Sequence, residues 1–182
     1  NARGVAMEYS PDCAIPYASR VDAGTAEAVR RRGVEIVSSG DLVQQFEATW
    51  SAAQLVLHRE AAAALYRIKD RAFQEASGAL AAGRPQTEYD LQSLIVKWFR
   101  EEGLVSDAPP VVAIGANAGN PHYLPTSEHN EVIVGDEVLL LDLWGKKPQP
   151  GAVYADITWV GATSRQVPAE AAAAFKAIVG AR

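Results

Sequence analysis

The chain has 182 residues, of which 48% are hydrophobic and 21% are charged, and its net charge at pH 7 is −5. This composition is typical of a globular protein and excludes a disordered, collagen-like or disulfide-stapled chain. No apolar run approaches the ~20 residues that span a bilayer, and no basic block indicates nucleic acid or an anionic membrane as a partner. Because Cys13 is the single cysteine, it cannot form an internal disulfide, and we expect a reducing, cytoplasmic location.

Residues 1–45 carry the pattern of a small α/β unit, which we take as a first domain. Its expected elements are strands at 4–8 and 34–37, a proline-containing loop through Pro11 and Pro16, a helix at 25–32 and a short helix that opens at 38–41. The chain begins with Asn1 rather than Met, and its first residues lack the layout of a signal peptide. We therefore expect a fragment of a longer protein.

Two helices are predicted next. The spacing from Ser51 to Gln54 is that of a capping box, and the following segment has a helical pattern to about residue 82. Its apolar residues keep helical spacing, so one stripe of this helix should be buried. A second helix begins at Thr87 and ends at Gly103, with an apolar face formed by Leu91, Leu94, Ile95, Trp98 and Phe99.

The segment after residue 110 has the pattern of β structure. The expected elements are strands at 111–114, 132–134, 137–144 and 153–160, a Gly/Asn/Pro loop at 115–127, a turn at 135–136 and a last helix over 169–179. Residues 46–182 are therefore expected to form a second domain. The predicted fold class is α/β (α+β), with an antiparallel sheet and flanking helices.

Two aspartates stand inside strand patterns that disfavour them. Asp142 lies in the apolar run 138–144, which predicts a strand covered on both faces, and Asp156 lies in the run 153–160. If the hairpin is symmetric about Gln149, the two acids stand directly opposite, about 4.5–5.5 Å apart at Cβ, where like charges destabilise a sheet. A shared proton, an Arg or Lys, or a metal with hard oxygen ligands would neutralise the pair. A single acid at a solvated strand end is the structural alternative.

His122 is the candidate for proton transfer, because it lies in a loop held by Gly and Pro next to the acidic strands. Its position alone leaves a structural role equally open. His58, in the long helix, and His129, in a polar loop, are interpreted as structural or surface residues. The chain contains no Cys/His zinc cluster, no His-Glu-x-x-His, no phosphate-binding loop and no Gly-x-Ser-x-Gly elbow.

Several motifs occur in a characteristic order in the second domain. They are Thr87-Glu88, the strand from Val111 to Gly115, Asn120-Pro-His-Tyr123, the segment from Gly135 to Asp142, and Tyr154-Ala-Asp156-Ile-Thr158. In these motifs the sequence resembles the pita-bread metallopeptidase family, in the branch of aminopeptidase P, prolidase and creatinase. The resemblance covers most of 51–182, which would be the N-terminal half of the catalytic domain. Residues 1–45 are similar to the end of the N-terminal domain of this branch.

The resemblance implies that Asp142 and Asp156 are ligands of two divalent metal ions, with Asp156 bridging both ions and Thr158 supporting it. The ions would be Mn²⁺, with Co²⁺ or Zn²⁺ as alternatives, and would hold a bridging hydroxide that attacks the peptide bond. His122 matches the family histidine that contacts substrate and assists proton movement. The implied substrate is a peptide with proline in second position, and the implied reaction is hydrolysis of the Xaa-Pro bond.

The sequence also departs from the family pattern. Trp159-Val160 replaces a usual Arg-Thr, and the connection between the two acids is slightly longer. The family's remaining ligands, one His and two Glu, would lie beyond Arg182, so we expect the chain alone to be inactive. Two alternatives stay open: a creatinase-like amidinohydrolase, which needs no metal, and a non-catalytic peptide- or protein-binding module. A homodimer is expected from the resemblance alone.

Overall fold

The structure is a computed structural model that describes residues 4–14 and 19–181. It divides into two compact units, Asn1–Ser51 and Ala52–Arg182. Pro16, which the sequence assigns to a loop, lies outside the described residues. Within the described ranges, no helix combines the length and the apolar character that crossing a membrane requires.

The first unit pairs two short strands in parallel, with Gly4 opposite Glu35 and Met7 opposite Ser38. A helix lies between the two strands in the chain, and it begins where the side chain of Asp22 accepts a hydrogen bond from the amide of Thr25 at 2.9 Å. These elements occur where the sequence predicts them, with small shifts of their ends. The elements in chain order are β1 (Gly4–Met7), the 3-10 helix η1 (Pro11–Cys13), α1 (Ala23–Arg30), β2 (Glu35–Ser38) and α2 (Gly40–Glu47).

Two helices, α3 (Ala52–Ala81) and α4 (Glu88–Glu101), form one layer of the second unit. Both lie where the sequence predicts them. A capping box begins α4, because the amide of Asp90 donates to Thr87 Oγ1 at 3.1 Å while the amide of Thr87 donates to the Asp90 carboxylate at 3.0 Å. Gly103, with φ of 65°, follows α4 in the left-handed conformation that suits glycine at a helix end.

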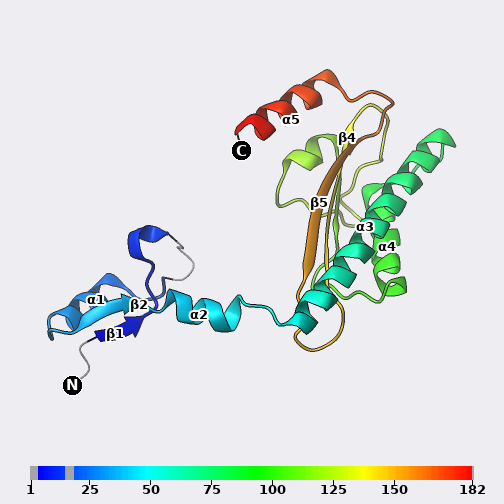
Figure 1. Cartoon of the computed structure of the whole chain (residues 1–182). Helices are drawn as coiled ribbons and strands as arrows, with labels where there is room; N and C mark the ends of the chain where they lie inside the picture. The colour runs from blue at the N-terminus through cyan, green and yellow to red at the C-terminus, as the bar shows by residue number, and fades with distance from the viewer. Residues whose placement is uncertain (1–3, 15–18, 182) are drawn as a thin grey trace. The chain divides into compact units, whose positions relative to one another are not determined.

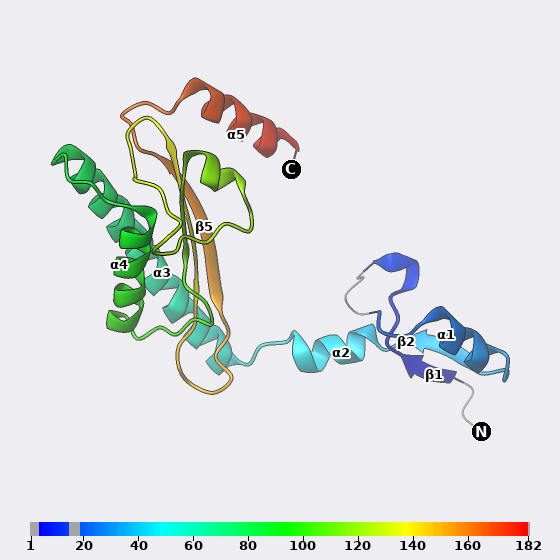
Figure 2. The ribbon, with the colours of Figure 1, turned by 180° about the vertical axis from the view of Figure 1, so that it is seen from behind.

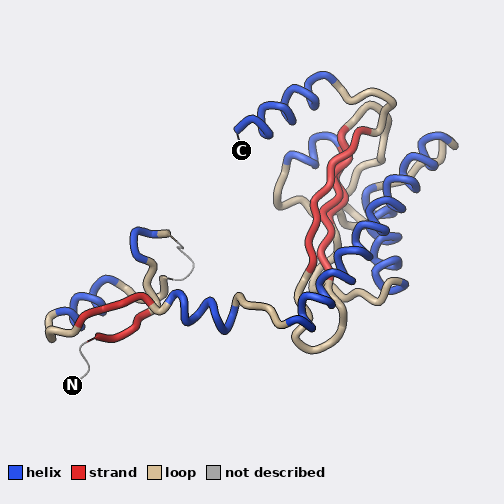
Figure 3. Tube along the Cα trace, in the orientation of Figure 1, coloured by secondary structure: helices blue, strands red, loops and turns tan. Residues whose placement is uncertain are grey.

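The other layer is an antiparallel sheet, and within the described residues its order is β3 (Val111–Ile114), β4 (Val138–Gly145) and β5 (Ala155–Ala162). Figures 1 and 2 show α3 and α4 on one side of this sheet, and the 3-10 helix η3 (Gly115–Gly119) and α5 (Ala169–Ala181) toward the other side. In Figure 3 the long strands β4 and β5 run side by side. The sheet therefore has one face covered by α3 and α4 and a second, more exposed face, here called the open face, which carries the exposed residues Asp156, Thr158 and Val160.

Two expectations about this sheet are wrong. Residues 132–134 do not form a strand, because Val132 makes only an isolated bridge with Thr87. The strand β4 is not covered on both faces, since its residues alternate between buried and half-buried positions. Leu139, Leu141 and Leu143 point into the core beneath the helices, where each buried leucine contributes about 1.5–3 kcal/mol to stability. The alternate residues of β4 face the open side.

Candidate metal centre

Asp142 and Asp156 share the open face of the sheet, but they do not stand directly opposite one another. Asp142 pairs with Thr158, and Asp156 pairs with Trp144. The predicted symmetry about Gln149 is therefore wrong by one position, and the ladder is centred on Pro150. Because the displacement moves the partner by two residues, both acids keep the same face. They become diagonal neighbours, whose Cα atoms are about 7–8 Å apart in an antiparallel ladder.

The carboxylate of Asp142 is held by its cross-strand partner. The hydroxyl of Thr158 donates a hydrogen bond to Asp142 Oδ1 at 2.7 Å. The resemblance implies that Thr158 supports Asp156, and the structure corrects this expectation: the pairing register places the hydroxyl beside Asp142. A bond of this kind orients one carboxylate oxygen and leaves the other available to a ligand.

The environment of Asp156 disfavours the charged form of its carboxyl group. Partial desolvation by the surrounding sheet raises its pKa above the ordinary value of 3.8, and the negative charge of Asp142 raises it further. Among the ion pairs of the described residues, none includes either aspartate. The charge of Asp142 therefore disfavours the charged form of Asp156.

This pair fits part of a site for a hard divalent cation. Carboxylate oxygens on one face of a sheet suit such an ion, and its positive charge would relieve the repulsion between Asp142 and Asp156. Within residues 4–14 and 19–181, no group of three or more His, Cys, Asp or Glu side chains could hold a metal. The two aspartates can supply two ligands, and a complete site needs more.

Trp144 borders the pair, because it lies beside Asp156 in the ladder. Its indole Nε1 donates to Asp107 Oδ1 at 2.8 Å, and this hydrogen bond lowers the pKa of Asp107. The segment that leads into β3 thereby fixes the orientation of an aromatic ring at the edge of the open face.

His122 is exposed and lies in the loop after η3. Its backbone amide donates to Asn120 Oδ1 at 3.0 Å. The described interactions do not bring its imidazole into contact with Asp142 or Asp156. The role of His122 thus stays a prediction.

The other two histidines have local roles. His58 Nδ1 lies 2.9 Å from the carbonyl oxygen of Tyr154, so it links α3 to the connection that precedes β5. His129 is exposed, and its backbone amide and carbonyl close a turn with Thr126. These positions agree with the structural interpretation of both residues.

The sequence patterns assign Glu88 only a place in a motif, yet the structure shows it completely buried at the start of α4. Its carboxylate accepts hydrogen bonds from the loop that carries His122, including one from Tyr123 Oη. One signal in the sequence could have identified it: Glu88, Leu91 and Ile95 share the helical spacing of the buried stripe, so an acid stands where an apolar residue is expected.

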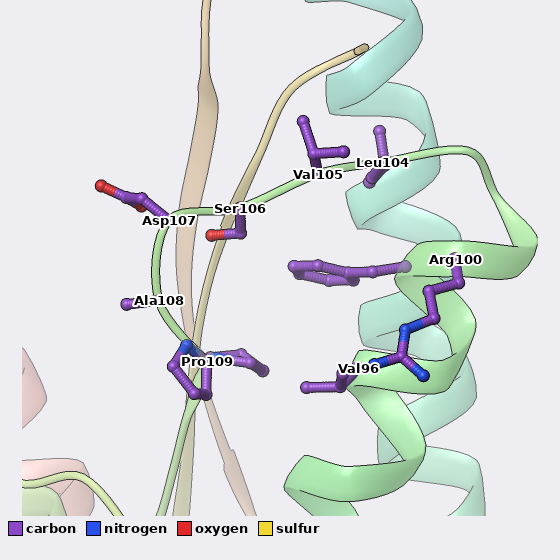
Figure 4. A pocket seen from close by; sticks show the side chains of 10 residues that line it. Val96, Arg100, Leu104, Val105, Ser106, Asp107, Ala108 and Pro109 are labelled. Atoms are coloured by element: carbon purple, nitrogen blue, oxygen red, sulfur yellow. The ribbon is translucent and has the colours of Figure 1, made fainter.

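The cavity in Figure 4 lies between α4 and the segment that leads into β3, and its volume is about 370 Å³. Its lining is mostly apolar, with Val96, Leu104 and Pro109 among the labelled side chains. The side chain of Asp107 points away from it, in keeping with the hydrogen bond to Trp144. The lining includes neither predicted metal ligand, so this cavity is separate from the candidate site.

The family model of Metallopeptidase family M24 matches residues 57–181, which is more than half of the chain. A comparison with curated proteins finds no match. The family match covers most of α3 and all of α4, the whole sheet and both aspartates.

Solved structures show the same fold. Dipeptidase PepE from Mycobacterium ulcerans is similar with a TM-score of 0.61 and 22% identity, over 87% of this chain and 40% of that chain. X-Pro aminopeptidase from Thermotoga maritima gives a TM-score of 0.59 at 19% identity, over 98% of this chain and 46% of that one. Prolidase from Pyrococcus furiosus gives 0.57 at 14% identity, over 89% and 45%. The chain spans less than half the length of each of these three proteins.

Proposed function

Because the chain belongs to metallopeptidase family M24, we propose that it is part of a peptidase that hydrolyses Xaa-Pro bonds with two divalent metal ions. The observation that carries this proposal is the placement of Asp142 and Asp156 on one open sheet face, where the charge of Asp142 raises the pKa of Asp156. The names of the similar structures, an X-Pro aminopeptidase and a prolidase, support the choice of substrate. Mn²⁺ is the proposed ion, with Co²⁺ or Zn²⁺ as alternatives.

In the proposed site Asp142 and Asp156 hold the metal ions, and other residues of the full-length protein complete the coordination. When bound, the metal pair supplies Lewis acidity and an activated water. Thr158 keeps the Asp142 carboxylate in its binding orientation. His122 contacts the substrate and carries a proton on its imidazole.

The cellular location and the class of substrate are proposed from the sequence. The single Cys13 supports a cytoplasmic location, and the acidic net charge favours a peptide substrate over nucleic acid or a membrane surface. We also propose a homodimer, by resemblance to the pita-bread family.

The test uses the full-length protein, assayed on a Xaa-Pro dipeptide and on a longer Xaa-Pro-Yaa peptide with added Mn²⁺ or Co²⁺. The Asp156→Asn variant should lose turnover and bound metal. Asp136→Asn is the matched control, because Asp136 is an exposed acid in a turn, and its φ of 63° is well tolerated by asparagine. The control should keep both turnover and metal.

The outcomes separate the alternatives. Turnover of the dipeptide alone would define a prolidase, and turnover of the longer peptide an aminopeptidase P-like enzyme. Peptide binding without turnover would support a binding module, and turnover unchanged by metal removal would support creatinase-like chemistry. Either of the last two results, with metal content equal in Asp156→Asn and Asp136→Asn, would overturn the proposal.

A further inference from the structure

Glu88 has no exposed surface, although it is an acid at the first residue of α4. A buried carboxylate is tolerated only where hydrogen-bond donors replace its water. In the described part of the chain, all the donors to the Glu88 carboxylate come from residues 114–131. They are the amide of Ile114 at 2.7 Å, Asn117 Nδ2 at 3.1 and 3.2 Å, Tyr123 Oη, and the amide of Glu131 at 2.8 Å.

These contacts fix both ends of the segment that contains His122. Ile114 lies at the end of β3, and Glu131 lies where the segment returns to α4. The amide of Glu88 also donates to the carbonyl of Glu131 at 2.9 Å, so the two residues bond reciprocally. One carboxylate therefore holds the start and the finish of a long loop against the same helix end.

The middle of the segment is tied to the same carboxylate through a closed ring of hydrogen bonds. From Glu88 the ring runs to the side-chain NH₂ of Asn117, and the backbone carbonyl of Asn117 accepts from the amide of Asn120 at 3.1 Å. The carbonyl of Asn120 accepts from the amide of Tyr123 at 3.0 Å, and Tyr123 Oη returns to Glu88. His122 lies in the turn that the bond between Asn120 and Tyr123 closes, and its own amide donates to Asn120 Oδ1.

The chemistry of Tyr123 suits this arrangement. Burial and the hydrogen bond to Glu88 raise the pKa of Tyr123, so its hydroxyl stays protonated and donates throughout the physiological range. Tyr123, the residue directly after His122, is thereby bonded to the buried Glu88 carboxylate through a hydroxyl that stays protonated.

We propose that Glu88 is a positioning residue: its buried carboxylate closes the ring of hydrogen bonds that sets the place of His122 in the loop after η3. This inference rests on the proposed catalytic role of His122. It assigns a function to an acid that touches neither Asp142 nor Asp156.

The first test variant is Glu88→Gln in the full-length protein. Glutamine has the same shape but brings an NH₂ group to a position surrounded by donors. The Tyr123 hydroxyl can turn to accept, but the backbone amide of either Ile114 or Glu131 loses its acceptor. Gln92→Met is the matched control. Gln92 is buried one turn further along α4, but its side chain donates to the carbonyl of Pro110 at 2.9 Å, and among the described hydrogen bonds it has none to residues 114–131.

Hydrogen exchange is the readout that does not need activity. Glu88→Gln should speed amide exchange across 114–131 and shift the imidazole resonances of His122, whereas Gln92→Met should leave both unchanged after correction for global stability. Tyr123→Phe, which removes one donor only, should give a smaller change of the same kind. Unchanged exchange of 114–131 in Glu88→Gln would overturn the proposal, whether or not the protein is a peptidase.

Kinetics then separate positioning from general loss of structure. We expect Glu88→Gln to lower kcat and kcat/KM together by about 100-fold, the scale on which a misplaced group costs rate. In a His122→Ala background the same substitution should cost almost nothing, because the group it positions is gone. An equal loss in both backgrounds would show that Glu88 does not act through His122. If the wild-type protein has no turnover, the proposed function fails, and the exchange experiment alone decides the positioning role.

Discussion

Asp156 lies diagonally across the β4–β5 ladder from Asp142, and the negative charge of Asp142 contributes to the raised pKa of Asp156. Thr158, directly opposite Asp142, donates a hydrogen bond that holds the Asp142 carboxylate in place. In the metal-free protein, the interaction between the two aspartates can be measured through the pKa of Asp156.

Replacing Asp142 by asparagine should lower the pKa of Asp156. The substitution preserves the contact with Thr158, since the side-chain amide oxygen of the Asp142→Asn variant can still accept the threonine hydroxyl. The pKa should fall toward 3.8 without reaching it, because partial desolvation, the larger cause, remains. Carbon-detected NMR titration of Asp156 in the presence of a chelator checks this. An unchanged pKa would mean that the two charges do not interact.

The same shift predicts a pH dependence of stability. Because the pKa of Asp156 is higher in the folded protein, its contribution is fully present below 3.8 and is lost as pH rises through the folded-state value. In metal-free protein, the wild type should lose more stability over this range than Asp142→Asn does. Urea unfolding at a series of pH values measures the difference. Parallel curves for the two proteins would contradict the prediction.

Leu141 and Leu140 are neighbours on β4 that should respond differently to truncation. Leu141 is completely buried beneath the helices, while Leu140 is half-buried on the open face. Leu141→Ala should cost about 2–5 kcal/mol of unfolding free energy because it leaves a cavity, and Leu140→Ala should cost clearly less. The midpoints of urea unfolding compare the two variants. Equal costs would show that the open face is packed as tightly as the core.

Gly161 leaves room for an aromatic ring. A Cβ at this position would lie 2.6 Å from Phe73 Cε1, so Gly161→Ala should destabilise the second unit by about 1–3 kcal/mol. Adding Phe73→Leu should recover part of the loss. Gly145→Ala is the matched control on β4, because its Cβ would meet no atom closer than 3.5 Å. A loss in the control as large as in Gly161→Ala would point to strand propensity instead of the ring.

Glu102 and Arg67 join α4 to α3 through two hydrogen bonds, of 2.6 and 3.1 Å. The hydrogen bond from Arg67 lowers the pKa of Glu102 below its ordinary value of 4.5. The pair therefore stabilises the fold above 4.5, and this contribution is lost as pH falls through the folded-state pKa. Glu102→Gln should be slightly less stable than wild type at neutral pH, and the difference should vanish in acid.

The size of that difference should also depend on salt. Both side chains are partly in water, so about 1 M salt should reduce the difference between wild type and Glu102→Gln. Thermal unfolding of both proteins in low and high salt tests this. A difference that persists unchanged in acid and in salt would indicate lost packing in place of lost charge.

Local signals predicted the helices well. The start of the second long helix at Thr87 and its end at Gly103 depend on short-range features, and the structure confirms both. The strands at 111–114 and 137–144 were also predicted, the second with its ends one residue early, because β-branched and leucine-rich runs between turns leave little ambiguity. The family resemblance is confirmed by the match to residues 57–181.

Features set by distant contacts were harder to predict. The register of β4 and β5 depends on the conformation of residues 146–154, including the hydrogen bond from Gln54 to the carbonyl of Gly151, which the strand pattern does not contain. The half-exposed face of β4 depends on where the helices pack, and a run of leucines does not reveal which side is covered. Glu88 was missed for the same reason, since its partners are known only from the fold.

The partners of Glu88 also bear on the order in which the chain folds. Ile114 and Glu131, which donate to this one carboxylate, are 26 and 43 residues away along the chain. Before both residues reach Glu88, the entropy cost of closing these loops opposes their hydrogen bonds, and the Glu88 carboxylate remains hydrated. We therefore expect this end of α4 to dock only after β3 and the returning loop are in place.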